Sequence, residues 1–439
     1  MVLLAATPLV AQQQAASASD FLDSVGVNTH FSYTDTTYYL QTAKTIAAIQ
    51  ALGIHHVRDG LAYGWVPPHL YAIYAQLAQA GIHPELVTPN PAHGGPSAQD
   101  LERLLPNYPG LDALEAPNEY DQAKDPNWAA DLRAYLPTLA QVGHDAGIPI
   151  IGPSLTQTDS YPKLGDVAAD ETYSNLHAYW GGRNPETGGW GPPDAQNHIY
   201  GSFAYDFDQM NITGPRKPVF MTETGYVVTD VPKVNQISEA VEAIYEPRLL
   251  LHAWNLGVRR TYIYELMDDP SSPPGIGLMH SDGTPRPAYT AVATLMHLLS
   301  DTPGARSPGK LAYTLQGNTG GLETTLLQKQ DGSFWLALWN PGCIYEVNRL
   351  QSTPIAPRTV TISVGGGEVI GNAWTFDETG QAQQKSIQTA TATLPIGSAV
   401  TLLEITTGAT ARTSAHRPGN RTSSRAANGS HAKRGQDAG

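Results

Sequence analysis

The chain has 439 residues, a formal net charge of −14 and a hydrophobic content of 41%. That length allows one large domain and a smaller one, with enough apolar residues for a sizeable core. The acidic balance excludes general nucleic-acid binding, which needs clustered Lys and Arg, and favours a neutral or weakly charged ligand. Cys343 is the single cysteine, so neither an internal disulfide nor a cysteine-based zinc site is possible.

Residues 1–19 contain a short apolar run followed by small residues, with "ASA" at 16–18. Such a segment resembles a signal peptide, although no positive charge precedes the apolar run. We therefore expect a leader over residues 1–19 and a secreted or periplasmic protein. No stretch reaches the roughly 18 apolar residues that a bilayer span requires, so no membrane insertion is expected.

Short runs of β type then alternate with amphipathic helical stretches. The candidate strands are 24–31, 55–60, 83–89, 111–119, 149–155, 173–180, 218–226 and 259–268. The clearest helical stretches are 38–53, 69–81, 128–147 and 237–257. Each of these stretches ends in a glycine, where a left-handed residue commonly terminates a helix.

Eight such units predict an α/β fold, a (β/α)₈ TIM barrel over residues 20–302. A doubly wound open sheet is the rival fold. That fold carries a Gly-rich phosphate loop after its first strand, and no such loop follows residues 24–31. The pattern therefore favours the barrel.

The pattern changes after residue 303 to short alternating strands separated by Gly, Asn-Pro and Asp-Gly turns. This predicts a small antiparallel β-sandwich over residues 303–407, either binding glycan or bracing the barrel. Residues 408–439 are rich in Ser, Arg and Gly and poor in apolar residues, which predicts a disordered basic tail.

The ends of the predicted barrel strands carry the residues of chemical interest, because barrel enzymes place their active sites there. The fourth strand ends with Asn118 and Glu119, and the seventh contains Glu223 near its end. Either motif alone is weak evidence, since a Glu near a strand end is usually solvated or ion-paired. Together they predict two carboxyl groups facing each other across the mouth, as a retaining glycosidase requires.

The motifs "PNE" at 117–119 and "TETG" at 222–225 resemble those of the clan A retaining glycoside hydrolases, most of all family 39. The resemblance implies that Glu119 is the acid/base and Glu223 the nucleophile. Arg58, His177 and Tyr179 match the positions where the clan places hydrogen-bonding side chains. Two of these residues have an alternative interpretation: His177 as a core histidine, and Arg58 as the partner of Asp59 in a surface ion pair.

Further substrate contacts follow from these positions. Asn118 is expected to donate to the sugar 2-hydroxyl, and Trp180, directly after the sixth strand, is expected to stack on a sugar face. The clan often ends its eighth strand in a tryptophan, but this strand reads "YIYELMDDP". Tyr264, Glu265 or a loop tryptophan is expected to take its place. The long connection 181–217 is expected to form a wall of the substrate cleft.

The sequence therefore predicts a glycosidase that cleaves a poly- or oligosaccharide as a monomer, without cofactor or metal. A non-catalytic carbohydrate-binding or cell-surface protein on the same barrel is the alternative from another class. A metal-dependent barrel hydrolase is less favoured, because the His-x-His pattern of such sites is missing from the strand ends.

Overall fold

The computed structural model describes residues 12–90, 94–229, 231, 233–269 and 274–407. Eight parallel strands form one sheet in the order β7-β6-β5-β4-β3-β10-β9-β8, and a bridge between Ile151 and Tyr173 joins its two ends. The predicted barrel is thereby confirmed. Its strands are β3 (Val25–Asn28), β4 (His56–Gly60), β5 (His83–Val87), β6 (Ala113–Glu115), β7 (Ile150–Ile151), β8 (Ser174–Tyr179), β9 (Val219–Gly225) and β10 (Val258–Ile263).

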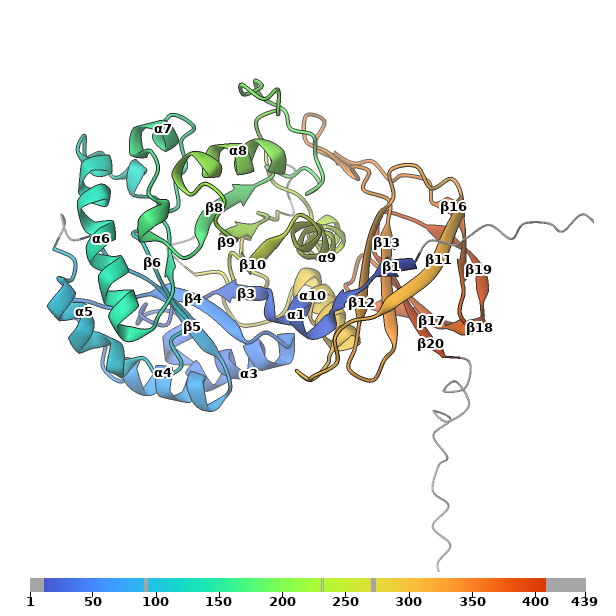
Figure 1. Cartoon of the computed structure of the whole chain (residues 1–439), viewed down its shortest axis with the longest axis horizontal. Helices are drawn as coiled ribbons and strands as arrows, with labels where there is room; N and C mark the ends of the chain where they lie inside the picture. Colours follow the sequence, from blue (N-terminus) through green and yellow to red (C-terminus); the bar gives the residue numbers. More distant parts are fainter. Residues whose placement is uncertain (1–11, 91–93, 230, 232, 270–273, 408–439) are drawn as a thin grey trace, which may run out of the picture.

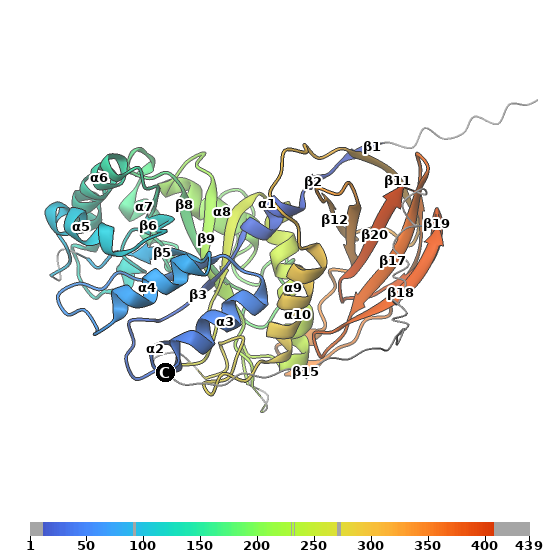
Figure 2. The same ribbon diagram turned by 90° about the horizontal axis from the view of Figure 1, so that it is seen from below.

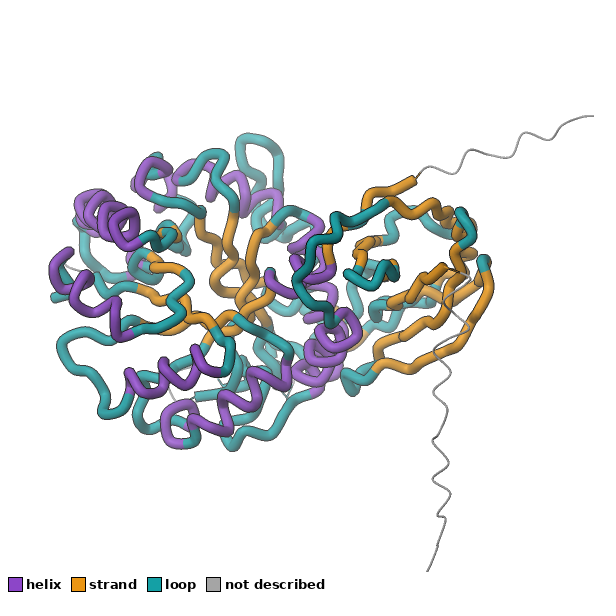
Figure 3. The backbone as a smooth tube through the Cα atoms, turned by 60° about the horizontal axis from the view of Figure 1, so that its bottom comes forward, coloured by secondary structure: helices purple, strands orange, loops and turns teal. Residues whose placement is uncertain are grey.

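Helices surround this barrel on the outside (Figure 1; Figure 3). The four predicted helices are present, the first of them divided into α2 and α3. The α-helices are α1 (Ala18–Asp23), α2 (Thr37–Leu40), α3 (Thr42–Leu52), α4 (Leu70–Gln79), α5 (Ala98–Leu104), α6 (Trp128–Ala146), α7 (Ser160–Leu164), α8 (Phe203–Thr213), α9 (Glu239–Asn255) and α10 (Pro287–Leu299). Short 3₁₀ turns are η2 (Leu105–Asn107), η3 (Tyr120–Gln122) and η4 (Ala168–Asp170).

Side chains fill the barrel interior in two levels. The lower level is apolar, with Ala113, Ile151, Phe220 and Tyr262 packed together. A Cβ atom on Gly26 would lie 2.3 Å from the Tyr262 ring, so this strand position must be glycine for the ring to fit. The level above it is polar and supports the mouth of the barrel.

The C-terminal domain contains two sheets that lie beside the barrel (Figure 2). One sheet has the order β1-β11-β16-β19, and the other has the order β18-β17-β20-β13-β12-β2. Their strands are β1 (Gln12–Gln14), β2 (Ala16–Ser17), β11 (Lys310–Gly317), β12 (Glu323–Gln328), β13 (Phe334–Trp339), β16 (Arg358–Val364), β17 (Glu368–Phe376), β18 (Ala382–Thr389), β19 (Thr391–Ile396) and β20 (Thr401–Thr407). A small hairpin joins β14 (Tyr345–Glu346) to β15 (Gln351–Ser352).

The N-terminal strands β1 and β2 belong to this second domain. β1 pairs with β11 and β2 pairs with β12, and α1 follows at once. The expected leader boundary at residue 19 does not match this arrangement, because a cut there would remove two strands from the sandwich. Residues 1–11 of that expected leader, and the expected tail 408–439, lie outside the described residues.

Helices α9 and α10 lie between the barrel and the sandwich (Figure 1; Figure 2). A buried ion pair joins Arg248 of α9 to Glu186, and the indole Nε1 of Trp339 donates to the same carboxylate at 2.6 Å. Trp335 and Trp339 of β13 pack into the same apolar cluster as the barrel helices. The two domains therefore share a continuous core. Within the described residues, no helix has the length and apolarity that a bilayer crossing requires.

Candidate active site

A bulge in strand β9 lets two consecutive residues face the barrel mouth. Along the β8–β9 pairing, Leu176 aligns with Met221 and His177 aligns with Glu223, so Thr222 is the extra residue. In a regular strand, neighbouring side chains point to opposite faces. The bulge instead brings both Thr222 and Glu223 to the site, a common role of bulges at active sites.

Arg58 of β4 is the centre of the polar level. Its guanidinium donates to both oxygens of Glu115, at 2.6 and 2.8 Å, and to Oε1 of Glu223 at 2.7 Å. It also donates to the side-chain oxygens of Asn28 and Asn118. Arg58 is only 4% exposed, so these planar, charge-assisted bonds are shielded from water and fix the group in one orientation. The expected site role of Arg58 is therefore supported over a surface pair with Asp59.

Glu223 is held as a carboxylate by its neighbours. Burial alone would raise its pKa, but the charges of His177 and Arg58 and the hydrogen bonds from Arg58 and Tyr179 bring that pKa below its ordinary value of 4.5. The Tyr179 hydroxyl donates to Oε2 of Glu223 at 2.9 Å. Gly225, two residues on, has a φ of 146°, and a Cβ there would lie 2.9 Å from the Tyr264 carbonyl oxygen. The glycine of "TETG" is therefore a steric requirement.

Glu119 and His177 form the second part of the site. Nδ1 of His177 lies 2.8 Å from Oε1 of Glu119, and Gln122 donates to the other oxygen of Glu119 at 2.7 Å. Glu119 has a left-handed backbone, with a φ of 41°, which carries a strain typical of functional positions. Its backbone N–H donates to the hydroxyl of Ser154, which helps to hold this conformation.

The two glutamates face each other as the sequence predicts. One carboxylate oxygen of Glu119 and one of Glu223 lie within 4.8 Å of each other. Asn118 is exposed at the same opening, and its Oδ1 accepts from Arg58, which turns its amide N–H group to the opening. Glu119, Glu223, Arg58, Asn118, His177 and Tyr179 are thus brought together.

Trp180 does not belong to this site, and its expected stacking on a sugar is wrong. The residue is 0% exposed and packs in the core with Phe203, at 4.4 Å between ring centroids. The period-2 alternation of β8 explains this placement. His177 and Tyr179 point to the mouth, whereas Ala178 and Trp180 point to the surrounding helices.

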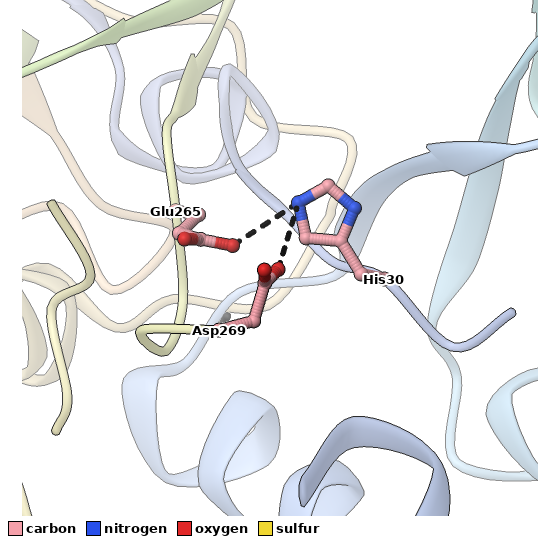
Figure 4. A group of neighbouring side chains, drawn as sticks. All are labelled: His30, Glu265 and Asp269. Carbon is pink, nitrogen blue, oxygen red and sulfur yellow. Dashed lines mark ion pairs between the residues drawn. The ribbon is translucent and has the colours of Figure 1, made fainter. Parts of the chain in front are cut away.

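Two acidic residues that follow β10 contact His30, a residue that was not identified from the sequence. Glu265 is 0% exposed, so its expected direct contact with substrate is wrong; its Oε2 instead lies 3.1 Å from Nε2 of His30. Asp269 lies 3.6 Å from the same nitrogen, and Figure 4 shows both carboxylates directed to one edge of the ring. Burial lowers the pKa of His30, but hydrogen bonding and the nearby carboxylates raise it above 6.5 overall. Tyr264 is half-buried with its ring 5.8 Å from that of His30.

Among the residues that the structure describes, three groups of side chains have donor atoms close enough to hold a metal ion: His30 with Glu265 and Asp269, Glu119 with His177 and Glu223, and Asp194 with His198 and Asp208. In each group an imidazole nitrogen lies within ion-pair distance of a carboxylate. A shared proton accounts for those contacts without a metal.

Solved structures with this fold include two glycoside hydrolases. One is a family 39 glycoside hydrolase from Bacteroides cellulosilyticus WH2, with a TM-score of 0.59 and 17% identity over 88% of this chain and 82% of that one. The other is a family 44 xyloglucanase from Paenibacillus polymyxa, with a TM-score of 0.54 and 11% identity over 90% of this chain and 97% of that one. No protein-family profile and no curated protein matches the chain.

The likeness to a family 39 enzyme confirms the expected resemblance at the level of the fold. In this chain "PNE" follows β6, the fourth barrel strand, and "TETG" ends β9, the seventh. The supporting residues Asn28, Glu115, Asn175 and Thr222 were not identified from sequence. Asn28 and Glu115 are the last residues of β3 and β6, and this position was the available signal. Asn175 and Thr222 lie inside β8 and β9, where no such signal exists.

Proposed function

We propose that this protein is a retaining glycoside hydrolase that cleaves O-glycosidic bonds of a poly- or oligosaccharide, with Glu223 as nucleophile and Glu119 as acid/base. The observation that carries the proposal is the distance of less than 4.8 Å between oxygens of the two glutamates. Retaining enzymes hold their carboxyl groups about 5–5.5 Å apart, whereas inverting enzymes leave about 6.5–9.5 Å for a water.

Glu223 has the surroundings of a nucleophile. Arg58 and Tyr179 each donate to one of its oxygens, which keeps it ionised and directs a lone pair to the opening. Attack on the anomeric carbon forms a glycosyl ester on Glu223 and breaks the bond to the leaving-group oxygen. Asn118 donates to the sugar 2-hydroxyl, a bond that strengthens in the transition state.

A chain of hydrogen bonds determines which nitrogen of His177 faces Glu119 without a hydrogen of its own. Asn175 donates its amide N–H group to Glu115, so its Oδ1 accepts from the hydroxyl of Thr222. That hydroxyl then accepts from Nε2–H of His177. The 2.8 Å contact between Nδ1 of His177 and Oε1 of Glu119 therefore holds one shared proton, which lies on Glu119 when His177 is neutral.

Glu119 transfers this proton to the leaving-group oxygen as the glycosidic bond breaks. It then takes a proton from the water that hydrolyses the ester, and Glu223 is released as a carboxylate. His177 contacts Glu119 throughout and moderates its change of charge.

The test is digestion of a panel of plant and bacterial polysaccharides with the wild type and Glu223→Gln, with product identification by mass spectrometry. We expect the wild type to release oligosaccharides from at least one polymer and the variant to release none while remaining folded. Full activity of Glu223→Gln on a cleaved polymer contradicts the proposal. A non-catalytic carbohydrate-binding protein is the second candidate, and binding without cleavage by the wild type supports it.

A further inference from the structure

A cavity of about 180 Å³, open to solvent, is lined in part by the proposed proton donor. Its lining includes Glu119, His177, Trp190, Tyr200 and Asp206. The volume equals roughly six water molecules, on the scale of one sugar ring. Because Glu119 protonates the leaving group, a sugar in this cavity lies on the leaving-group side of the scissile bond.

The cavity is built from the long connection that the sequence marks as a cleft wall. Trp190 and Tyr200 belong to residues 181–217, and they remain 38% and 41% exposed. Tyr200 packs edge-on against Tyr205 of α8, whose hydroxyl is 2.9 Å from that of Thr158. Partly exposed aromatic side chains beside polar groups suit a sugar, which presents C–H faces and hydroxyl edges.

Asp206 of α8 is the unusual group in this wall. No hydrogen bond or ion pair joins its carboxyl group to another described residue, although neighbouring Asp208 pairs with His198 at 2.6 Å. Burial raises the pKa of Asp206 to about 7. Asp206 is half-buried, and a partly desolvated carboxyl group without a partner gains a charge-assisted hydrogen bond from a bound cation or donor.

The charges around the cavity favour one class of ligand. Its described lining contains two acidic residues, Glu119 and Asp206, and neither lysine nor arginine. Arg183 stacks on Trp190 at 4.2 Å but does not line the cavity. Because Glu119 carries a proton in the proposed mechanism, Asp206 is the charged group there. It would repel an anionic sugar such as a uronic acid, whereas an ammonium group would pair with it and contact the aromatic side chains.

We infer that this cavity is the leaving-group subsite and that it accepts a sugar residue with a free amino group, whose ammonium pairs with Asp206. The assignment to the leaving group rests on the proposed function, because it takes Glu119 as the proton donor. The amine site itself rests on the cavity and on Asp206.

Binding of simple sugars tests the inference without any need for turnover. The protein is titrated with D-glucosamine, D-glucose, N-acetyl-D-glucosamine and D-glucuronate, and binding is followed by tryptophan fluorescence and by saturation-transfer NMR. We expect glucosamine to bind at least about tenfold more tightly than the other three, as a hydrogen bond between charged groups requires.

Two variants on α8 test whether Asp206 causes the preference for glucosamine. Asp206→Asn is expected to weaken glucosamine binding about tenfold or more and to leave glucose binding within about twofold. Asp208→Asn, which alters a carboxylate outside the cavity lining, is expected to change neither. Equal binding of glucosamine and glucose by the wild type, or an unchanged preference in folded Asp206→Asn, overturns the inference. A glucosamine preference in a protein that cleaves no polysaccharide refutes the leaving-group assignment alone.

Discussion

Nη1 of Arg58 lies 2.7 Å from Oε1 of Glu223, and the same guanidinium holds both oxygens of Glu115. Arg58 therefore links the proposed nucleophile to a rigid anchor on β6. Replacement by lysine keeps the charge but loses the planar set of donors. We expect Arg58→Lys to lower kcat about 100-fold or more, since a small misplacement of a reacting group has that effect.

Arg58→Ala adds a stability defect to the catalytic one. It leaves the buried Glu115 and Glu223 without their cation, which typically costs about 3–5 kcal/mol of unfolding free energy. Chemical denaturation measures this loss. A variant with wild-type stability and wild-type kcat contradicts the proposed role of the network.

Glu119→Ala is expected to reduce turnover of natural glycosides strongly while sparing substrates with good leaving groups, which need no acid. Azide then fits the space left by the side chain and attacks the glycosyl ester without a general base. We expect azide to accelerate the variant and not the wild type, and to yield a glycosyl azide with retained configuration. Rescue without that product argues against Glu119 as the acid/base.

Glu246 makes folding stability depend on pH. Burial raises its pKa to about 8, while an unfolded glutamate titrates near about 4.3. Between these values the folded protein holds a proton that the unfolded chain has released, so stability falls as pH rises through this window. At pH 8, Glu246→Gln is expected to be more stable than the wild type by over 1 kcal/mol, roughly the free energy that corresponds to a shift of one pKa unit. At pH 4, the two proteins are expected to have similar unfolding free energies.

Urea denaturation at both pH values measures this effect. Glu242, also buried one helical turn earlier, has a raised pKa for the same reason and adds to the slope. The exposed Glu102 serves as the control, and Glu102→Gln is expected to leave the slope unchanged. An unaltered pH dependence in Glu246→Gln contradicts the assignment.

Gly26→Ala tests the packing of the barrel interior. The new Cβ would lie 2.3 Å from the Tyr262 ring, so the strand or the ring must move, at a typical cost of about 1–3 kcal/mol. Gly320→Ala is the matched control, because no atom lies within 4 Å of a Cβ there. The melting temperatures of the two variants should therefore differ by several degrees. Equal melting temperatures contradict the packing described for the lower level.

The sequence predicts the barrel well because eight strand signals alternate with helical stretches and the strand ends carry polar residues. Glu119 and Glu223 were found for that reason. Trp180 and Glu265 were assigned from their place in the chain, without regard to which side of the backbone each faces. Alternation along β8 sends Trp180 into the core, and Glu265 is covered by His30.

The bulge at Thr222 and the pairing of β1 and β2 with the sandwich depend on contacts between distant segments. Thr222 becomes the extra residue only because β8 and β9 align out of step there. Gln12–Gln14 form a strand only because β11 offers an edge almost 300 residues later. Such features follow from tertiary pairing, which local composition does not encode.

The covalent intermediate tests the central claim most directly. Glu119→Ala is mixed with an activated aryl glycoside of the sugar that the polysaccharide panel identifies, quenched in acid and analysed by intact mass and peptide mapping. The proposed mechanism predicts a mass increase of one glycosyl unit, located on the peptide that contains Glu223. A glycosyl group on any other residue, or turnover with inverted configuration and no adduct, contradicts it.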